Sequence, residues 1–212
     1  MGFDSHQYVV RQDAISWSLT FLVGAIFLYN SAIFLGGWTD LAITSVFMMV
    51  VMMFGLLMNI VLTGKVDRDE SIDRNETQEI FYFSGLAFAV IALTNWMIPV
   101  VVPVALGTAV LQGLNLRLYA IFVATAEEQF FRAFVTPFFA NRIGFAGGCI
   151  ASGAFFAVYH LGAYKTDLNI LTIVFLSGMV LSYIALKTQR VSPSMIAHAI
   201  VNFSAAGGFF WG

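Results

Sequence analysis

Long stretches of uncharged, apolar residues constrain this chain more than any other feature. The first occupies residues 14–34 and the second residues 41–62. A helix needs about 20 such residues to cross a bilayer, and both stretches reach that length. Strands of a membrane barrel would alternate polar and apolar residues, and these stretches do not. The sequence therefore predicts an all-α fold, a polytopic bundle of transmembrane helices.

The later stretches set the number of spans at seven or eight. One of them, residues 80–116, is too long for a single helix, and Asn95, Pro99 and Pro103 mark its expected break, because proline ends or kinks a helix. Reading this stretch as one span or as two gives the two counts. The others occupy residues 118–140, 143–164, 168–186 and 191–211.

The long polar segment, residues 64–79, separates the second and third stretches and is predicted to be a solvated loop, with a short helix as the alternative for part of it. Its basic residues and Arg11 predict a cytoplasmic N-terminus, because cytoplasmic loops carry an excess of Lys and Arg. We expect a multi-pass protein of the cytoplasmic membrane of a prokaryote. Residues 1–99 would form N-terminal helices without a functional signature, and residues 100–212 a catalytic helical core.

Composition excludes several other classes of protein. Hydrophobic residues make up 59% of the chain and charged residues only 10%, against roughly 25% charged in soluble domains. Membrane lipid is therefore an expected partner. The net charge is −2 and no basic cluster exists, which argues against a nucleic acid partner. Cys149 is the single cysteine, so a disulfide scaffold is excluded.

Charged residues inside the apolar stretches are few, and three of them fall together in residues 118–140: Glu127, Glu128 and Arg132. Each would cost roughly 2.5–3.5 kcal/mol alone at the centre of a bilayer. Glu128 and Arg132 are four residues apart, so they can form an ion pair on one helix face. Glu127 lies about 100° around the helix and keeps its carboxylate free. The alternative is an interfacial helix whose charged side chains extend to water.

Two of the three histidines, His160 and His198, also fall within apolar stretches. A single membrane histidine usually serves helix packing, but two of them with a free glutamate on three segments favour a polar site. Asn202 shares a helix face with His198, and Phe156 shares one with His160. The H-E-x-x-H pattern of zinc proteases is absent. A serine-type site made of Ser152 and His198 stays open as an alternative.

These residues resemble the three motifs of the CAAX protease and bacteriocin-processing (CPBP) family, which includes the type II CAAX prenyl endopeptidases. Residues 127–132 resemble its E-E-x-x-x-R motif, residues 156–160 its F-x-x-x-H motif, and residues 198–202 its H-x-x-x-N motif. Their order and spacing also agree, and the resemblance covers about residues 100–212. One departure is Ala133, where many members have glycine after the arginine.

The resemblance implies hydrolysis of peptide bonds by an activated water, without a covalent intermediate. Glu127 would act as general base, and His160 would hold the water and later deliver a proton. His198 and Asn202 would stabilise the oxyanion of the tetrahedral intermediate. The supporting residues would be Glu128, Arg132 and Phe156.

The expected substrate is a membrane-tethered protein or peptide, including lipid-modified chains with a prenylated C-terminus. By analogy with the family we expect no cofactor and no metal. The alternative is zinc bound by Glu127, His160 and His198. Two further readings remain open: a catalytically silent scaffold or chaperone of the same fold, and a transporter that relays protons through intramembrane Glu and His.

Overall fold

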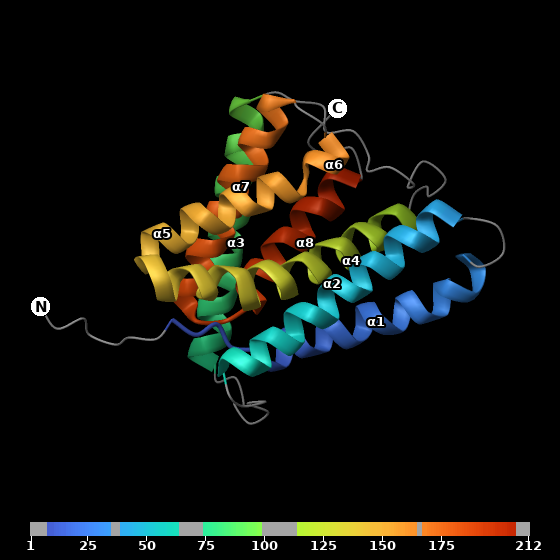
Figure 1. Cartoon of the computed structure of the whole chain (residues 1–212), viewed down its shortest axis with the longest axis horizontal. Helices are drawn as coiled ribbons and strands as arrows, with labels where there is room; N and C mark the ends of the chain where they lie inside the picture. Colours follow the sequence, from blue (N-terminus) through green and yellow to red (C-terminus); the bar gives the residue numbers. More distant parts are fainter. Residues whose placement is uncertain (1–7, 35–38, 64–73, 99–113, 165–166, 207–212) are drawn as a thin grey trace, which may run out of the picture.

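The computed structural model describes residues 8–34, 39–63, 74–98, 114–164 and 167–206 (Figure 1). Within these ranges the chain is helical apart from short connections, and its only strand-like pairing is an isolated bridge between Arg11 and Arg190. The predicted all-α fold is confirmed. The helices are α1 (Ala14–Phe34), α2 (Thr39–Thr63), α3 (Arg74–Met97), α4 (Leu114–Phe130), the π-helix η1 (Phe131–Val135), α5 (Thr136–Tyr159), α6 (Leu161–Tyr164), α7 (Leu168–Thr188) and α8 (Ser192–Ala206).

Four helical stretches among the described residues are long and apolar enough to cross a membrane. They are Ile43–Thr63, Arg74–Met97, Leu116–Tyr159 and Leu168–Thr188. Large apolar side chains on their outer faces are exposed, as expected where lipid is the solvent. Together with α1 and α8, which pack against them, these stretches are compatible with the predicted seven or eight spans.

The longest stretch, 44 residues, is not one straight helix. Gly144 has φ 80° and ψ 173°, a conformation outside the helical region that favours glycine. The chain turns back on itself in this part of α5 (Figure 1). The two predicted segments, 118–140 and 143–164, are therefore two arms that meet at a tight corner.

The last residues of the predicted loop 64–79 are helical, because α3 begins at Arg74 and so earlier than the predicted residue 80. The first turns of α3 are polar, and Glu76 forms an ion pair with Arg190 between α7 and α8. A helix can extend beyond its apolar part when its polar turn finds such partners. Residues 64–73 lie outside the described ranges.

The predicted break in residues 80–116 is supported on its N-terminal side. α3 ends at Met97, two residues before Pro99. Pro99 and Pro103 themselves lie in residues 99–113, outside the described ranges, as does the end of the last predicted span after residue 206.

Backbone pairing places several turns at one end of the bundle. The amide of Arg11 donates to the carbonyl of Gln189 over 2.8 Å, and the amide of Val191 donates to the carbonyl of Arg11 over 3.1 Å. Asn141, just before the corner at Gly144, exchanges two hydrogen bonds with the backbone of Tyr8. The N-terminal segment, the α5 corner and the α7–α8 turn therefore lie together.

Candidate active site

The helical stretch that carries the first motif changes its hydrogen-bond register inside the motif. Glu127 and Glu128 end α4, and Arg132 lies in the π-helix η1, where Thr136 donates its amide to the carbonyl of Phe131. Single π-turns within α-helices are frequent at functional sites. The wider turn changes the direction of the Arg132 side chain relative to a regular α-helix.

Two residues of α2 fit against this irregular turn. The side-chain amide of Asn59 donates to the carbonyl of Ala133 over 2.8 Å, which satisfies a backbone group inside η1. A Cβ at Gly55 would lie 2.3 Å from the carbonyl oxygen of Gln129, so only glycine allows α2 to approach α4 this closely. Sequence reasoning missed both residues, because an isolated Asn or Gly in an apolar stretch has no pattern.

Glu128 connects the first and third motifs. Its Oε2 lies 3.4 Å from Nε of Arg132, so the ion pair predicted from the spacing is present, and both side chains are fully buried. Its Oε1 lies 2.8 Å from Nδ1 of His198 on α8, a contact that the spacing did not predict. Glu128 thus pairs with Arg132 on its own helical stretch and with His198 on another helix.

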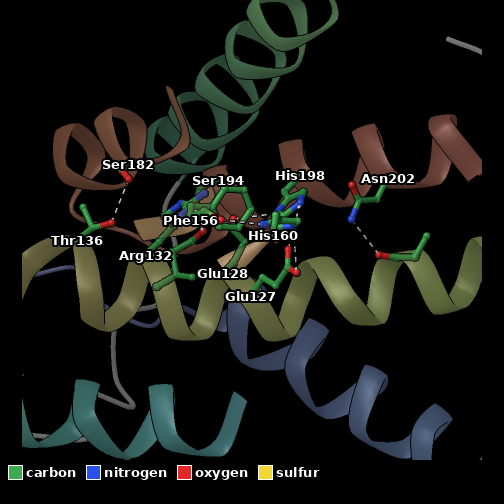
Figure 2. Close-up of polar contacts among 12 residues, drawn as sticks. Glu127, Glu128, Arg132, Thr136, Phe156, His160, Ser182, Ser194, His198 and Asn202 are labelled. Atoms are coloured by element: carbon green, nitrogen blue, oxygen red, sulfur yellow. Dashed lines mark hydrogen bonds and ion pairs between the residues drawn. The ribbon is translucent and has the colours of Figure 1, made fainter. Parts of the chain in front are cut away.

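The two predicted histidines converge on Glu127 from different helices (Figure 2). Nε2 of His160, directly after α5, lies 3.6 Å from Oε1 of Glu127. Nε2 of His198 lies 3.7 Å from Oε2 of the same carboxylate. Glu127 is only 2% exposed, which excludes the interfacial reading in which its charge extends to water. Both distances exceed those of a direct hydrogen bond.

The partners of Nδ1 assign the protons on both rings. In His160, Nδ1 lies 2.8 Å from the carbonyl oxygen of Phe156, which can only accept, so this nitrogen carries hydrogen. In His198, Nδ1 donates in the same way to the Glu128 carboxylate. When the rings are neutral, both Nε2 atoms therefore present lone pairs toward Glu127.

Aromatic rings hold the two histidines and the buried cation in place. The ring of Phe156 meets His160 edge-on at 4.5 Å and His198 at 5.8 Å between centroids. The Arg132 guanidinium carbon lies 4.7 Å from the centroid of the same ring, a cation–π arrangement. The predicted supporting residue Phe156 therefore contacts all three motifs.

Tyr164 is a further neighbour of the site that the sequence did not reveal. Its ring stacks on His160 with 5.6 Å between centroids and an interplanar angle of 7°. The flat face of this ring therefore covers one side of the His160 ring.

Asn202 lies on α8 about one turn beyond His198, beside α4 (Figure 2). Its Nδ2 donates to the carbonyl oxygen of Ala120 over 3.4 Å, and the side chain is half-buried. Ala120 precedes Glu127 by about two turns of α4. Among the described contacts, Asn202 therefore bonds to the backbone of α4 and not to Glu127 or the histidine rings.

The hydroxyl of Ser152 is engaged elsewhere. It lies 2.8 Å from the hydroxyl of Thr136, which lies 3.1 Å from that of Ser182. These buried hydroxyls join the start of α5 to its second arm and to α7. No described hydrogen bond joins Ser152 to His198, so the geometry gives the serine-type alternative no support.

The described residues contain no group of three His, Cys, Asp or Glu side chains arranged to hold a metal ion. Each histidine instead faces a different oxygen of Glu127. The arrangement is suited to proton transfer, because one carboxylate and two ring nitrogens with free lone pairs surround one buried point.

The fold and the site together define an integral membrane protein, all-helical in its described part, with a buried glutamate–histidine centre. Residues 109–204 match the family model described as type II CAAX prenyl endopeptidase Rce1-like. This match confirms the resemblance and supports a CAAX-type peptidase function. No curated protein and no solved structure matches the chain.

Proposed function

We propose that the protein is an intramembrane endopeptidase that uses Glu127 to activate a water molecule. Its substrates would be proteins or peptides tethered to the membrane, including chains with a prenylated C-terminus. The observation that carries the proposal is the convergence of Glu127, His160 and His198 in a buried position. The match to the Rce1-like family supports the same kind of chemistry.

In the proposed reaction, the Glu127 carboxylate takes a proton from water while Nε2 of His160 accepts the second hydrogen of that water. The water oxygen then attacks the carbonyl carbon of the scissile bond. The proton held by Glu127 then passes through Nε2 of His160 to the nitrogen of the leaving amine as the C–N bond breaks. The bond from His160 to the Phe156 carbonyl keeps Nε2 free for this role.

His198 would act on the oxyanion of the tetrahedral intermediate. Because its Nδ1 is bonded to Glu128, donation to substrate requires a proton on Nε2, which makes the ring an imidazolium. The Glu128 carboxylate at 2.8 Å stabilises that positive charge. Asn202 would add a second donor by turning its amide from the Ala120 carbonyl, to which its hydrogen bond is long.

The proposal is tested by comparing membranes that contain the wild-type protein with membranes that contain Glu127→Gln. The variant keeps the side-chain volume and removes the base, so cleavage should fall by roughly 10²–10⁴-fold. Proteomic analysis of C-terminal fragments identifies the substrates, and thermal unfolding checks that the variant folds.

Glu79→Gln is the matched control, because Glu79 is an exposed glutamate on α3 far from the motifs in sequence. It should cleave like the wild type. Equal cleavage by a folded Glu127→Gln variant would exclude Glu127 as the base. If no membrane fragment depends on the wild-type protein, the scaffold or transporter readings gain support.

A further inference from the structure

The non-helical segment before α1, residues 8–13, crosses one end of the bundle and is called here the N-terminal strap. It bonds to four separate parts of the chain that follow α1. The pairs are Tyr8 with Asn141, Val10 with Asn59, Arg11 with Gln189 and Val191, Gln12 with Gln129, and Asp13 with Ser192. Two of these partners lie on the helices that carry Glu127 and His198.

The link to α4 is a reciprocal pair of amides. Nε2 of Gln12 donates to Oε1 of Gln129 over 2.6 Å, and Nε2 of Gln129 donates to Oε1 of Gln12 over 3.0 Å. Gln129 also donates to the hydroxyl of Thr20 over 2.8 Å and is fully buried. Because buried amides must satisfy their donors and acceptors, these bonds fix the orientation of Gln129.

Gln129 follows the two glutamates of the first motif directly. It lies two residues after Glu127, about 200° around the helix, so the two side chains leave α4 on opposite faces. The strap therefore contacts α4 on the face that carries Gln129. His160 and His198 lie on the opposite face, which carries Glu127. The close approach of Gly55 to the backbone of Gln129 limits movement of the same turn.

The link to α8 is made by the next residue of the strap. Asp13 accepts the backbone amide of Ser16 over 2.8 Å through Oδ1 and the hydroxyl of Ser192 through Oδ2. Asp13 and Ser192 are both buried, and Ser192 begins α8 less than two turns before His198. Adjacent residues of the strap thus hold α4 and α8.

We propose that Gln12 and Asp13 are positioning residues that set the separation of Glu127 and His198 by anchoring α4 and α8 to one short segment. Neither side chain touches the reacting groups, so both act through Gln129 and Ser192. The catalytic part of this inference rests on the proposed peptidase function. The geometric part does not rest on that function, because it concerns only how the strap positions His198 and its hydrogen bond to Glu128.

The test uses the full-length protein in nanodiscs with Gln12→Met, which keeps the volume and removes the amide bonds. Since a misplacement of about 1 Å can cost 10²-fold, we expect kcat to fall by roughly 10–100-fold with KM changed less than about twofold. Asn141→Leu is the matched control, because Asn141 also makes two hydrogen bonds to the strap, at 2.7 and 2.9 Å. Because Asn141 is exposed, this variant should lower the unfolding temperature less than Gln12→Met does, and it should leave kcat unchanged.

A second measurement needs no substrate. The chain has three histidines, so ¹⁵N-histidine labelling gives few ring signals, and His198→Gln assigns the N–H bonded to Glu128. Gln12→Met should shift or broaden this signal, and Asn141→Leu should not. Ser192→Ala breaks the other link, should act like Gln12→Met, and replaces it if that variant does not fold.

The two measurements distinguish failure of the positioning role from failure of the proposed peptidase function. An unchanged His198 signal in both Gln12→Met and Ser192→Ala overturns the positioning role, whatever the activity. A loss of kcat as large in Asn141→Leu as in Gln12→Met also overturns it, because the strap would then act only through stability. If the wild type cleaves nothing while the His198 signal responds as expected, the proposed function fails and the positioning role stands.

Discussion

Glu127 and Gln129 stand two residues apart in α4, but the buried polar clusters to which they belong differ in construction. Around Gln129, amides and a hydroxyl bond to one another over 2.6 to 3.0 Å. Around Glu127, the carboxylate and the two ring nitrogens face one another at 3.6 and 3.7 Å without bonding directly. Nearby, Oε2 of Glu128 and all three guanidinium nitrogens of Arg132 have no hydrogen-bond partner among the described residues.

The contrast teaches which cluster stabilises the fold and which one lowers its stability. Satisfied buried hydrogen bonds contribute about 0.5–1.5 kcal/mol each, whereas an unsatisfied buried polar group costs about 1–3 kcal/mol. Such groups persist in proteins mainly where they serve a function. The cluster of Gln12, Thr20 and Gln129 therefore anchors the turn that carries Glu127 and the incompletely bonded Glu128–Arg132 pair.

The largest effect is expected from Glu128→Gln, because Glu128 is the one residue of the site whose charge also supports the fold. The change leaves the fully buried Arg132 without its partner, and breaking a buried pair costs about 3–5 kcal/mol. The free energy of unfolding in detergent should fall by that amount. Activity should fall as well, because His198 loses the carboxylate that orients it.

The double variant Glu128→Gln/Arg132→Met sharpens this prediction. Removing both charges leaves no unpaired ion, so most of the lost stability should return while activity stays low. A Glu128→Gln variant as stable as the wild type would show that the Arg132 guanidinium depends on its aromatic neighbours and not on Glu128.

Asn202→Ala should lower activity strongly and change stability little. The side chain is half-buried and its bond to Ala120 is long, so the free energy of unfolding should change by less than about 1 kcal/mol. If the amide stabilises the oxyanion, kcat should fall by roughly 10²–10³-fold with little change in KM. Steady-state kinetics checks both values. An Asn202→Ala variant with normal kcat would leave His198 as the only predicted donor.

Much of the fold follows from the sequence because apolar length and spacing within one helix are local properties. α1 begins at residue 14 and ends at residue 34, as predicted, and α7 begins at the predicted residue 168. The motif residues converge because each motif places its polar atoms on one face of its own helix. The Glu128–Arg132 pair was predictable for the same reason.

The rest depends on contacts between distant parts of the chain. The bond from Glu128 to His198 joins residues 70 positions apart, and that from Gln12 to Gln129 joins residues 117 apart. No spacing rule anticipates such pairs. The register shift in η1 and the partner of Glu76 that extends α3 were missed because both arise from packing. Gly144 lies at the start of the predicted segment 143–164, and its tight corner was not apparent from the sequence.

The smallest effect is expected from removal of metal ions. Glu127, His160 and His198 are residue types that bind zinc, with a water in the fourth position. In the structure His160 faces Oε1 and His198 faces Oε2 of Glu127, and both Nε2 atoms lie where they can hold a water molecule against the carboxylate. We therefore expect purified protein to contain less than about 0.1 zinc per chain and to keep full activity in EDTA, since a metal site needs one ion per chain.

The measurement combines metal analysis with cleavage before and after dialysis against a strong chelator, and the buffer-dialysed protein is the control. In the metal-free reaction, Asn202→Ala should stay severely impaired whether or not zinc is added, because its amide would act on the oxyanion. In a zinc-dependent reaction, chelation should abolish activity, added zinc should restore it, and Asn202→Ala should be comparatively mild. That second pattern, with stoichiometric zinc lost in Glu127→Gln, would replace the proposed general base by a metal ligand and leave the anchoring cluster behind α4 unaffected.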